Sequence, residues 1–433
     1  MKTKCPLLRF GFRISGFIFC ALFVFGVEEA HADAVSLPLK GYFHPGRAMP
    51  VRWDISSGKS ADGIIQLSAS GAITSLVQWA GNPHGIFPWL VIDRNVRDIR
   101  WRLPDGSGGS FSSLHPLEDS DWLVASTLND DSAAGSLFRG RRVILLHLPS
   151  GMDGPAMAWE TLDAILLTPE ALTKISSSVR GDLFAAGVEL AVMGEARPDG
   201  ILPWQHSGPW WLASANLRLA PMVDSDAYAP TYGWVAGRSA EFRRHIFLLG
   251  AIYCLIVAGI ALWRSRWMAV AIVAASILAG FVFASENRKS SPIFRRGGVV
   301  RLIDGSALKD DWVYQVSHRD ADFRMPVEDS VRPVFFSLSQ LRTMNLAMDC
   351  GDSGQPVAIS GRLSADEPLA LMHRRLSVKS IGGPLVAPAT TPLRLLAADP
   401  MYRGFAIAGQ VSGVTPDDSW PTLILKRTNP TQP

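Results

Sequence analysis

Apolar residues follow three patterns along this chain, and each pattern predicts a different kind of element. In the first part, apolar and polar positions alternate, as in residues 51–55 (VRWDI) and 99–103 (IRWRL). A period of two is typical of strands with one face in a core and the other in water. Turn residues such as Gly81, Asn82 and Pro83 separate these strands. The pattern therefore predicts a β-sandwich over residues 33–118.

The alternation stops near residue 121, where continuous apolar runs begin. They are DWLVAS (121–126), RVILLHL (142–148), LDAILLT (162–168) and VELAVMG (188–194). Runs of this kind are typical of strands buried on both faces. Between the last two runs, a helical period starts after Pro169 and ends at Gly187. This β-α-β order favours a parallel sheet with flanking helices, which predicts an α/β domain over residues 119–245.

Residues 158–194 resemble the core of flavodoxin-like domains related to class I glutamine amidotransferases. The segment GYFHPGR (41–47), which precedes a Val-x-Trp strand, is similar to the β-sandwich that uncharacterised bacterial membrane-anchored proteins join to such a domain. An amidotransferase needs a nucleophilic cysteine in a tight turn. Beyond the first 32 residues the only cysteines are Cys254 and Cys350, and neither lies in residues 119–245. The resemblance therefore implies the fold without the activity.

Two uncharged apolar runs, residues 246–263 and 267–284, are separated only by Arg264, Ser265 and Arg266. Each is long enough to cross a hydrocarbon core of ~30 Å as a helix, which predicts a two-helix transmembrane hairpin over residues 246–284. Residues 1–32 have a basic start, an apolar stretch and the ending Ala-His-Ala, which is typical of a signal peptide. The segment is either cleaved off or retained as a membrane anchor, and both alternatives place the residues after it on the outer side of the membrane. We therefore expect a protein of the bacterial inner membrane, with the lipid bilayer as one partner and polar domains facing the periplasm.

The last part, residues 285–433, returns to short strands such as VVRLI (299–303) and TLILK (422–426), with Pro and Gly between them. It predicts a C-terminal β-rich domain. The expected fold class is thus a multidomain α/β plus all-β protein with a transmembrane helical hairpin.

The composition of the chain limits which ligands it is expected to bind. The chain has 42 basic and 39 acidic residues, a net charge of +3, which gives no drive toward nucleic acid. Nine histidines occur without a metal-ligand spacing, and no glycine-rich loop leads into a helix that could hold a phosphate. We therefore predict no metal and no cofactor.

One short motif resembles a catalytic segment. Residues 350–356 (CGDSGQP) are similar to the nucleophile segment of chymotrypsin-like serine proteases. The resemblance implies Ser353 as nucleophile, Gly351 as an oxyanion-hole donor and His318 as the base. However, Gln355 replaces a glycine, and His318 lacks the sequence context of that family. A polar turn between two strands uses the same residue types.

The sequence as a whole favours a non-enzymatic, membrane-anchored envelope protein that binds or scaffolds other membrane proteins in an assembly. One alternative is a serine hydrolase that uses Ser353. Another is an ancillary subunit that presents a glycan or peptide to a transporter or synthase. In that case Trp204, Trp210 and Trp211 would be stacking platforms, although tryptophans in a core would give the same pattern.

Overall fold

The structure is a computed structural model that describes most of the chain between residues 34 and 427. The described residues are 34–55, 63–111, 114–128, 137–138, 140–148, 152–200, 202–215, 293–295, 299–303, 306–315, 320–328, 331–334, 338–364, 369–377, 385–386, 405–411 and 422–427, with isolated positions between 244 and 276.

The structure is mostly β-sheet, with 50% strand and 15% helix. The α-helices that lie wholly within the described ranges are short: α3 (Pro169–Lys174), α4 (Ser177–Ala185) and α7 (Leu338–Met344) have 6, 9 and 7 residues. None of the helices in the described ranges combines the length and the apolar character that a bilayer crossing requires. The fold class expected from the sequence, an α/β plus all-β protein built around a transmembrane hairpin, is therefore wrong. The expectation was based on uncharged apolar runs in the sequence. The fold class depends instead on which strands pair with one another, and those strands are distant in the sequence.

Most of residues 246–284, the range assigned to the hairpin, lies outside the described residues. At two positions that are described, Tyr253 Oη lies 2.8 Å from Ser276 Oγ. The segment 1–32, assigned to a signal peptide, lies wholly outside the described residues. The description as a periplasmic membrane protein with a signal peptide therefore has no support in the structure.

The alternating segments near the N-terminus form the strands that the sequence predicts, and they lie in two sheets. A three-stranded antiparallel sheet has the order β1-β3-β6, which are Val35–Ser36, Ala48–Asp54 and His84–Leu90. The second sheet contains β5 (Thr74–Trp79), β4 (Gly63–Ser70), β7 (Arg97–Arg102) and the edge strand β8 (Gly108–Ser110). A short parallel pair, β2 (Tyr42–Phe43) with β9 (His115–Pro116), lies beside them.

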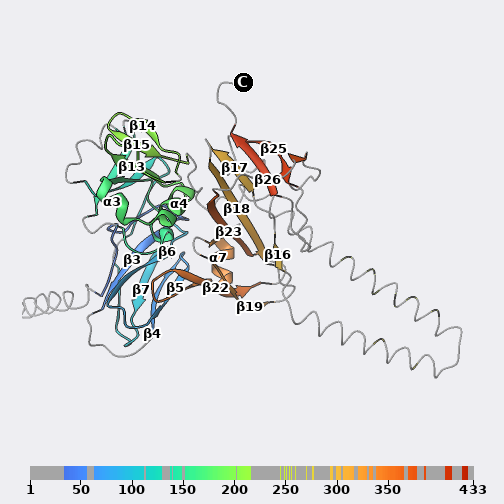
Figure 1. The fold of residues 1–433 in the computed structure, drawn as a ribbon. Coiled ribbons are helices and arrows are strands. Elements are labelled where there is room, and N and C mark those ends of the chain that lie inside the picture. The colour runs from blue at the N-terminus through green and yellow to red at the C-terminus, as the bar shows by residue number, and fades with distance from the viewer. Residues whose placement is uncertain are drawn as a thin grey trace, which may run out of the picture.

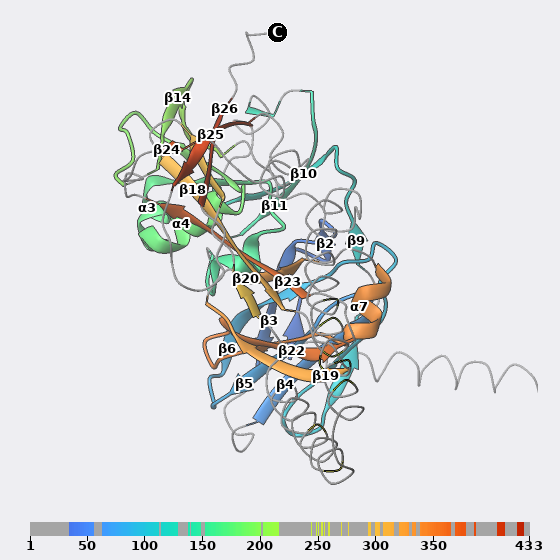
Figure 2. The ribbon, with the colours of Figure 1, turned by 90° about the vertical axis from the view of Figure 1, so that its right-hand side faces the viewer.

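Three more strands of the second sheet come from the other end of the chain. β21 (Ala347–Cys350) pairs in parallel with β5, and β22 (Pro356–Leu363) and β19 (Ala321–Pro326) follow, so that the order is β19-β22-β21-β5-β4-β7-β8. The orange strands β19 and β22 accordingly belong to the same sheet as the blue strands β4 and β5, with β21 between them (Figures 1 and 2). The sheet therefore joins residues that the sequence analysis placed in separate domains.

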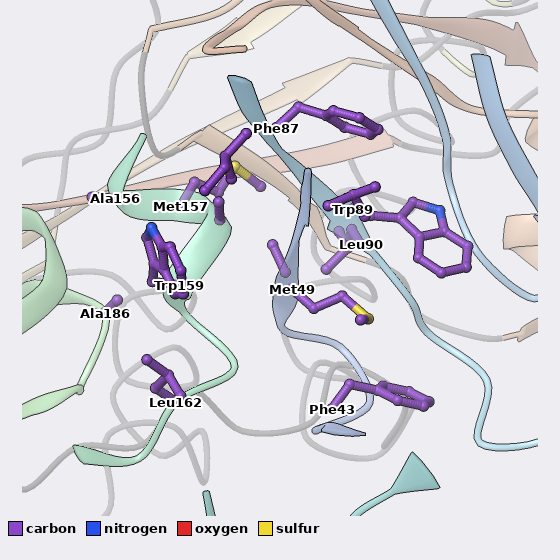
Figure 3. Close-up of a cluster of buried hydrophobic side chains, with 14 of the residues drawn as sticks. Phe43, Met49, Phe87, Trp89, Leu90, Ala156, Met157, Trp159, Leu162 and Ala186 are labelled. Atoms are coloured by element: carbon purple, nitrogen blue, oxygen red, sulfur yellow. The ribbon is translucent and has the colours of Figure 1, made fainter. Parts of the chain in front are cut away.

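A continuous apolar core links the N-terminal strands to residues 156–162. Trp89 and Phe87 on β6 and Met49 on β3 are fully buried. The short 3-10 helix η2 (Ala156–Trp159) packs on β3 and β6 and adds its own buried side chains. Figure 3 shows Met157 beside Phe87, with Trp159 and Leu162 completing the same cluster.

The four continuous apolar runs form a parallel sheet, as the sequence predicts. The strands are β10 (Asp121–Ser126), β11 (Arg142–His147), β12 (Ala164–Leu167) and β13 (Glu189–Met193). With the antiparallel β15 (Trp210–Ala213) and β14 (Gln205–Ser207), the order is β11-β10-β12-β13-β15-β14. The single helix predicted between β12 and β13 is two helices, because Ile175 is extended and the Ser176 side chain caps α4.

The remaining strands form an eight-stranded C-terminal sheet. Its order is β20 (Val331–Val334), β23 (Leu369–Ser377), β18 (Ser306–Gln315), β17 (Val299–Ile303), β26 (Thr422–Arg427), β25 (Phe405–Val411) and β24 (Leu385–Val386), with β16 (Ile293–Arg295) pairing with β18. β23 packs against α4, where Leu376 approaches Gly181. The C-terminal sheet therefore stands beside the α/β sheet (Figure 1).

Candidate functional site: a buried ionic junction

Charged side chains from three parts of the chain meet near the start of the parallel strands β10 and β12. Asp163, which directly precedes β12, is the first centre of this group. Its Oδ2 lies 2.8 Å from His44 Nε2 and accepts the backbone N–H of Leu123 at 2.8 Å. Its Oδ1 accepts from Arg47 Nη1 at 3.0 Å. The carboxylate thereby ties the loop before β3 to the start of two parallel strands.

The loop around residues 40–47 is shaped to present His44 and Arg47. Gly41 and Gly46 have φ values of 78° and 81°, which favour glycine because it lacks a Cβ. The backbone N–H of His44 donates to Thr161 Oγ1 at 2.7 Å, and the N–H of Thr161 donates to Ala48 O at 2.9 Å. These bonds fix the loop against the segment that leads into β12.

Glu160 is the second centre. Arg332 on β20 donates from Nη2 to Glu160 Oε1 at 2.5 Å, although the two residues are 172 positions apart. The side chains are 1% and 2% exposed. The pKa of Glu160 is raised because burial disfavours its charged form, while the positive charges of Arg332, Arg374 and Arg47 act to lower it. Glu160 therefore lies among arginines from both ends of the chain.

The C-terminal sheet contributes a further ion pair. Asp310 on β18 and Arg374 on β23 are cross-strand neighbours. Arg374 donates from Nε and Nη2 to the two carboxylate oxygens, at 2.6 and 3.2 Å, and both side chains are buried. Such two-pronged contacts are the strongest form of an arginine–carboxylate pair. We call the whole group the ionic junction: His44, Arg47, Glu160, Asp163, Asp310, Arg332 and Arg374.

The ionic junction is suited to holding segments together and not to contacting a substrate. His44 is 5% exposed and Asp163 is 2% exposed, so this histidine–carboxylate pair is closed to solvent. Removing one partner of a buried ion pair typically costs about 3–5 kcal/mol, because it leaves a charge in a poorly solvating interior. The junction therefore couples the loop before β3, the α/β sheet and the C-terminal sheet.

The residues that resemble a protease segment form the turn between β21 and β22. Ser353 is exposed in this turn. The N–H of Gly351 donates to Gln355 O at 2.9 Å, so it is already engaged in the turn and does not point to a free oxyanion hole. His318 lies outside the described residues.

Cys350, the last residue of β21, directly precedes this turn and is fully buried. Burial raises the pKa of its thiol to about 12. The side chain is therefore a neutral thiol at physiological pH.

The three tryptophans proposed as stacking platforms lie in different surroundings. Trp204 is 5% exposed in the main core, and Trp210 is 1% exposed on the other face of the α/β sheet. Trp211 is half-buried, contacts His206 with ring centroids 4.7 Å apart, and donates from Nε1 to Glu195 O at 3.3 Å. Of the three, Trp211 alone has an accessible side chain, so the structure does not assemble them into one platform.

Within the described residues, no group of three or more His, Cys, Asp or Glu side chains is arranged to hold a metal ion. Comparison of the chain with protein-family models, with the curated proteins and with the solved structures finds no match.

Sequence reasoning missed the ionic junction, although two of its members lie in a segment that it singled out. His44 and Arg47 belong to residues 41–47, noted only for their likeness to other sandwiches. Glu160 and Asp163 lie in the short segment between η2 and β12, and nothing in that segment marks them as buried. Their partners lie 116 to 172 positions away, so no local spacing identifies them.

Proposed function

We propose that this protein is a non-catalytic binding or scaffolding protein whose sheets form one fixed frame. The observation that supports this proposal best is the ionic junction. Its carboxylates and arginines are buried and directed at one another across segments from both ends of the chain. Buried charges that pair with one another in this way hold segments of the fold together.

Two further features of the sheets support the proposal that they form one fixed frame. The seven-stranded sheet is completed only when β21 joins β5, so the N-terminal and C-terminal segments form one structural unit. One face of that sheet carries polar exposed side chains, among them Arg100, Arg102 and Arg324. The exposed side chains on this face are accessible to a binding partner.

The test is cross-linking in intact cells followed by purification of the full chain and mass spectrometry. We expect stable protein partners whose cross-links map to exposed strands, and the same partners with Ser353→Ala. The Asp163→Asn variant, which breaks the ionic junction, should lose partners in parallel with its loss of folded protein. Recovery of the wild-type chain without any partner would contradict the proposal.

The serine hydrolase alternative has its own test. A fluorophosphonate probe that labels the wild-type chain and fails to label Ser353→Ala would establish a reactive serine and overturn the non-catalytic assignment. We expect no labelling, because the Gly351 amide is committed to the turn.

A further inference from the structure

A groove of about 400 Å³ lies on the seven-stranded sheet at its β8 end. Its walls come from β4, β7 and β8. The polar side chains that line it are those of Gln66, Ser68, Arg100 and Arg102. The two arginines are exposed, and no acidic residue lines the groove.

The strand register places these four side chains on one face. Gln66 is opposite Arg102, and Ser68 is opposite Arg100. Trp101, which lies between the arginines on β7, faces the core and is 6% exposed. Residues two apart on a strand are separated by about 7 Å, so the two guanidinium groups start at that spacing.

Two glycines let β8 lie close against β7 at one side of the groove. A Cβ on Gly109 would lie 2.7 Å from the Trp101 ring, and one on Gly108 would lie 2.5 Å from Trp101 O. Only glycine allows β8 to approach β7 this closely. Because β8 ends the sheet, its outer backbone edge has no neighbouring strand within the sheet.

The two arginines differ from others on the same face of the sheet. Arg324 pairs with Asp349 at 2.8 Å, and Arg362 pairs with Asp320 at 3.1 Å. Among the described residues, Arg100 and Arg102 form no ion pair. Two exposed arginines without an ion-pair partner among the described residues therefore lie on neighbouring positions of one face at the groove.

We propose that this groove binds an extended acidic peptide segment of a partner protein. Alternate side chains of an extended chain are also about 7 Å apart, so carboxylates at positions i and i+2 match Arg100 and Arg102. Guanidinium groups bind carboxylates through two parallel hydrogen bonds. Gln66 and Ser68 offer an amide and a hydroxyl to the backbone of a peptide that lies along the groove. The assignment rests on the proposed binding function and names the chemistry of the partner.

The experiment measures fluorescence anisotropy of a labelled peptide with alternating Asp and Thr, titrated with the full chain at low salt. We expect saturable binding, and no binding of the matched peptide with alternating Asn and Thr. Arg100→Gln and Arg102→Gln should each weaken binding about fivefold, the value for a partly exposed ion pair of about 1 kcal/mol. The double variant should weaken it about 20-fold or more.

Arg97→Gln is the matched control, because Arg97 is exposed on the same strand and does not line the groove. It should change affinity less than twofold. Thermal unfolding of each variant checks that the fold is retained. An equal loss with Arg97→Gln would mean general charge attraction and would overturn the proposal.

Two other results would also overturn it. One is absence of peptide binding to the wild-type chain. The other is tighter binding of a sulfated oligosaccharide of the same charge with the same dependence on Arg100 and Arg102, since the occupant would then be a carbohydrate. If partners are still recovered by cross-linking while the peptide fails to bind, the groove assignment fails and the proposed scaffolding function stands.

Discussion

Gly354 packs directly on the backbone of Ile86. A Cβ at Gly354 would lie 2.0 Å from Ile86 O, and the φ of Gly354 is 82°. Ile86 belongs to β6 near the N-terminus, whereas Gly354 lies in the turn between β21 and β22. Gly154, just before η2, approaches Ile86 from another segment, where a Cβ would lie 2.9 Å from the Ile86 Cβ. Three distant parts of the chain therefore meet at one residue.

The first prediction concerns this contact. Gly354→Ala should destabilise the protein by about 3 kcal/mol or more, because the change combines left-handed backbone strain with overpacking against a backbone atom. Gly106→Ala is the matched control, since Gly106 has the same φ of 82° with nothing within 4 Å of its Cβ. For the control, urea unfolding should show a loss of only about 1 kcal/mol in the free energy of unfolding, which is the cost of the left-handed backbone conformation alone. Equal losses for the two variants would mean that the close approach to Ile86 is absent.

The second prediction concerns Asp163. Asp163→Asn should lower the free energy of unfolding by about 3–5 kcal/mol, because the buried Arg47 loses this negative charge. One of the two oxygens that accept from Arg47 and from the Leu123 N–H also becomes an NH2 group, which cannot accept. Asp320→Asn removes a carboxylate from an exposed pair whose side chains are 59% and 56% exposed. That control should cost less than about 0.5 kcal/mol by the same measurement. A cost for Asp163→Asn as small as that of the control would count against the ionic junction.

The third prediction concerns Cys350. Burial raises the pKa of this thiol to about 12, and the thiolate is the reactive form. Iodoacetamide at pH 7.5 should leave Cys350 unmodified in the folded chain and modify it in urea, as read from the Cys350 peptide by mass spectrometry. Rapid modification in the folded chain would show that the turn between β21 and β22 opens.

The fourth prediction concerns His373 on β23. Its pKa is lowered, first because burial disfavours the charged ring and second because Arg375 is close, while Glu328 and Asp311 act to raise it and Arg332 to lower it. A base with a lowered pKa in the folded state takes up its proton more readily when unfolded. Stability should therefore fall as pH drops below the ordinary value of 6.5. His373→Gln should flatten this part of the stability curve, and an unchanged slope would exclude His373 as its source.

The local pattern of apolar and polar residues was sufficient to predict many of the strands. Alternation at residues 51–55 and 99–103 identified β3 and β7, and the apolar run at 162–168 identified β12 with its parallel neighbours. In each case the period of two, or its absence, reflects how many faces of a strand are buried. The break at Ile175 was missed, because Ser176 can both continue a helix and cap a new one.

Long-range pairing was not predictable in this way. Nothing near residue 347 indicates that β21 completes a sheet begun by β5, since every strand offers the same backbone groups to any neighbour. The resemblance at residues 350–356 was likewise decided by context: the same residues form a turn held by Gly351 and Gln355. The ion pairs of the ionic junction depend both on which strands pair and on which segments lie around each charged residue. The sequence alone therefore identified none of these pairs.

The most direct test of the account is a double-mutant cycle on Glu160 and Arg332, measured by urea unfolding at pH 7 with Glu160→Gln, Arg332→Met and the combined variant. If this buried pair joins the C-terminal sheet to the α/β sheet, the two single losses should sum to at least about 1 kcal/mol more than the loss in the combined variant, with a single transition in wild type. The cycle on the exposed pair Asp320 and Arg362 should give a coupling near zero. Additive losses at Glu160 and Arg332, or separate unfolding of the two sheets in the wild-type chain, would contradict the account.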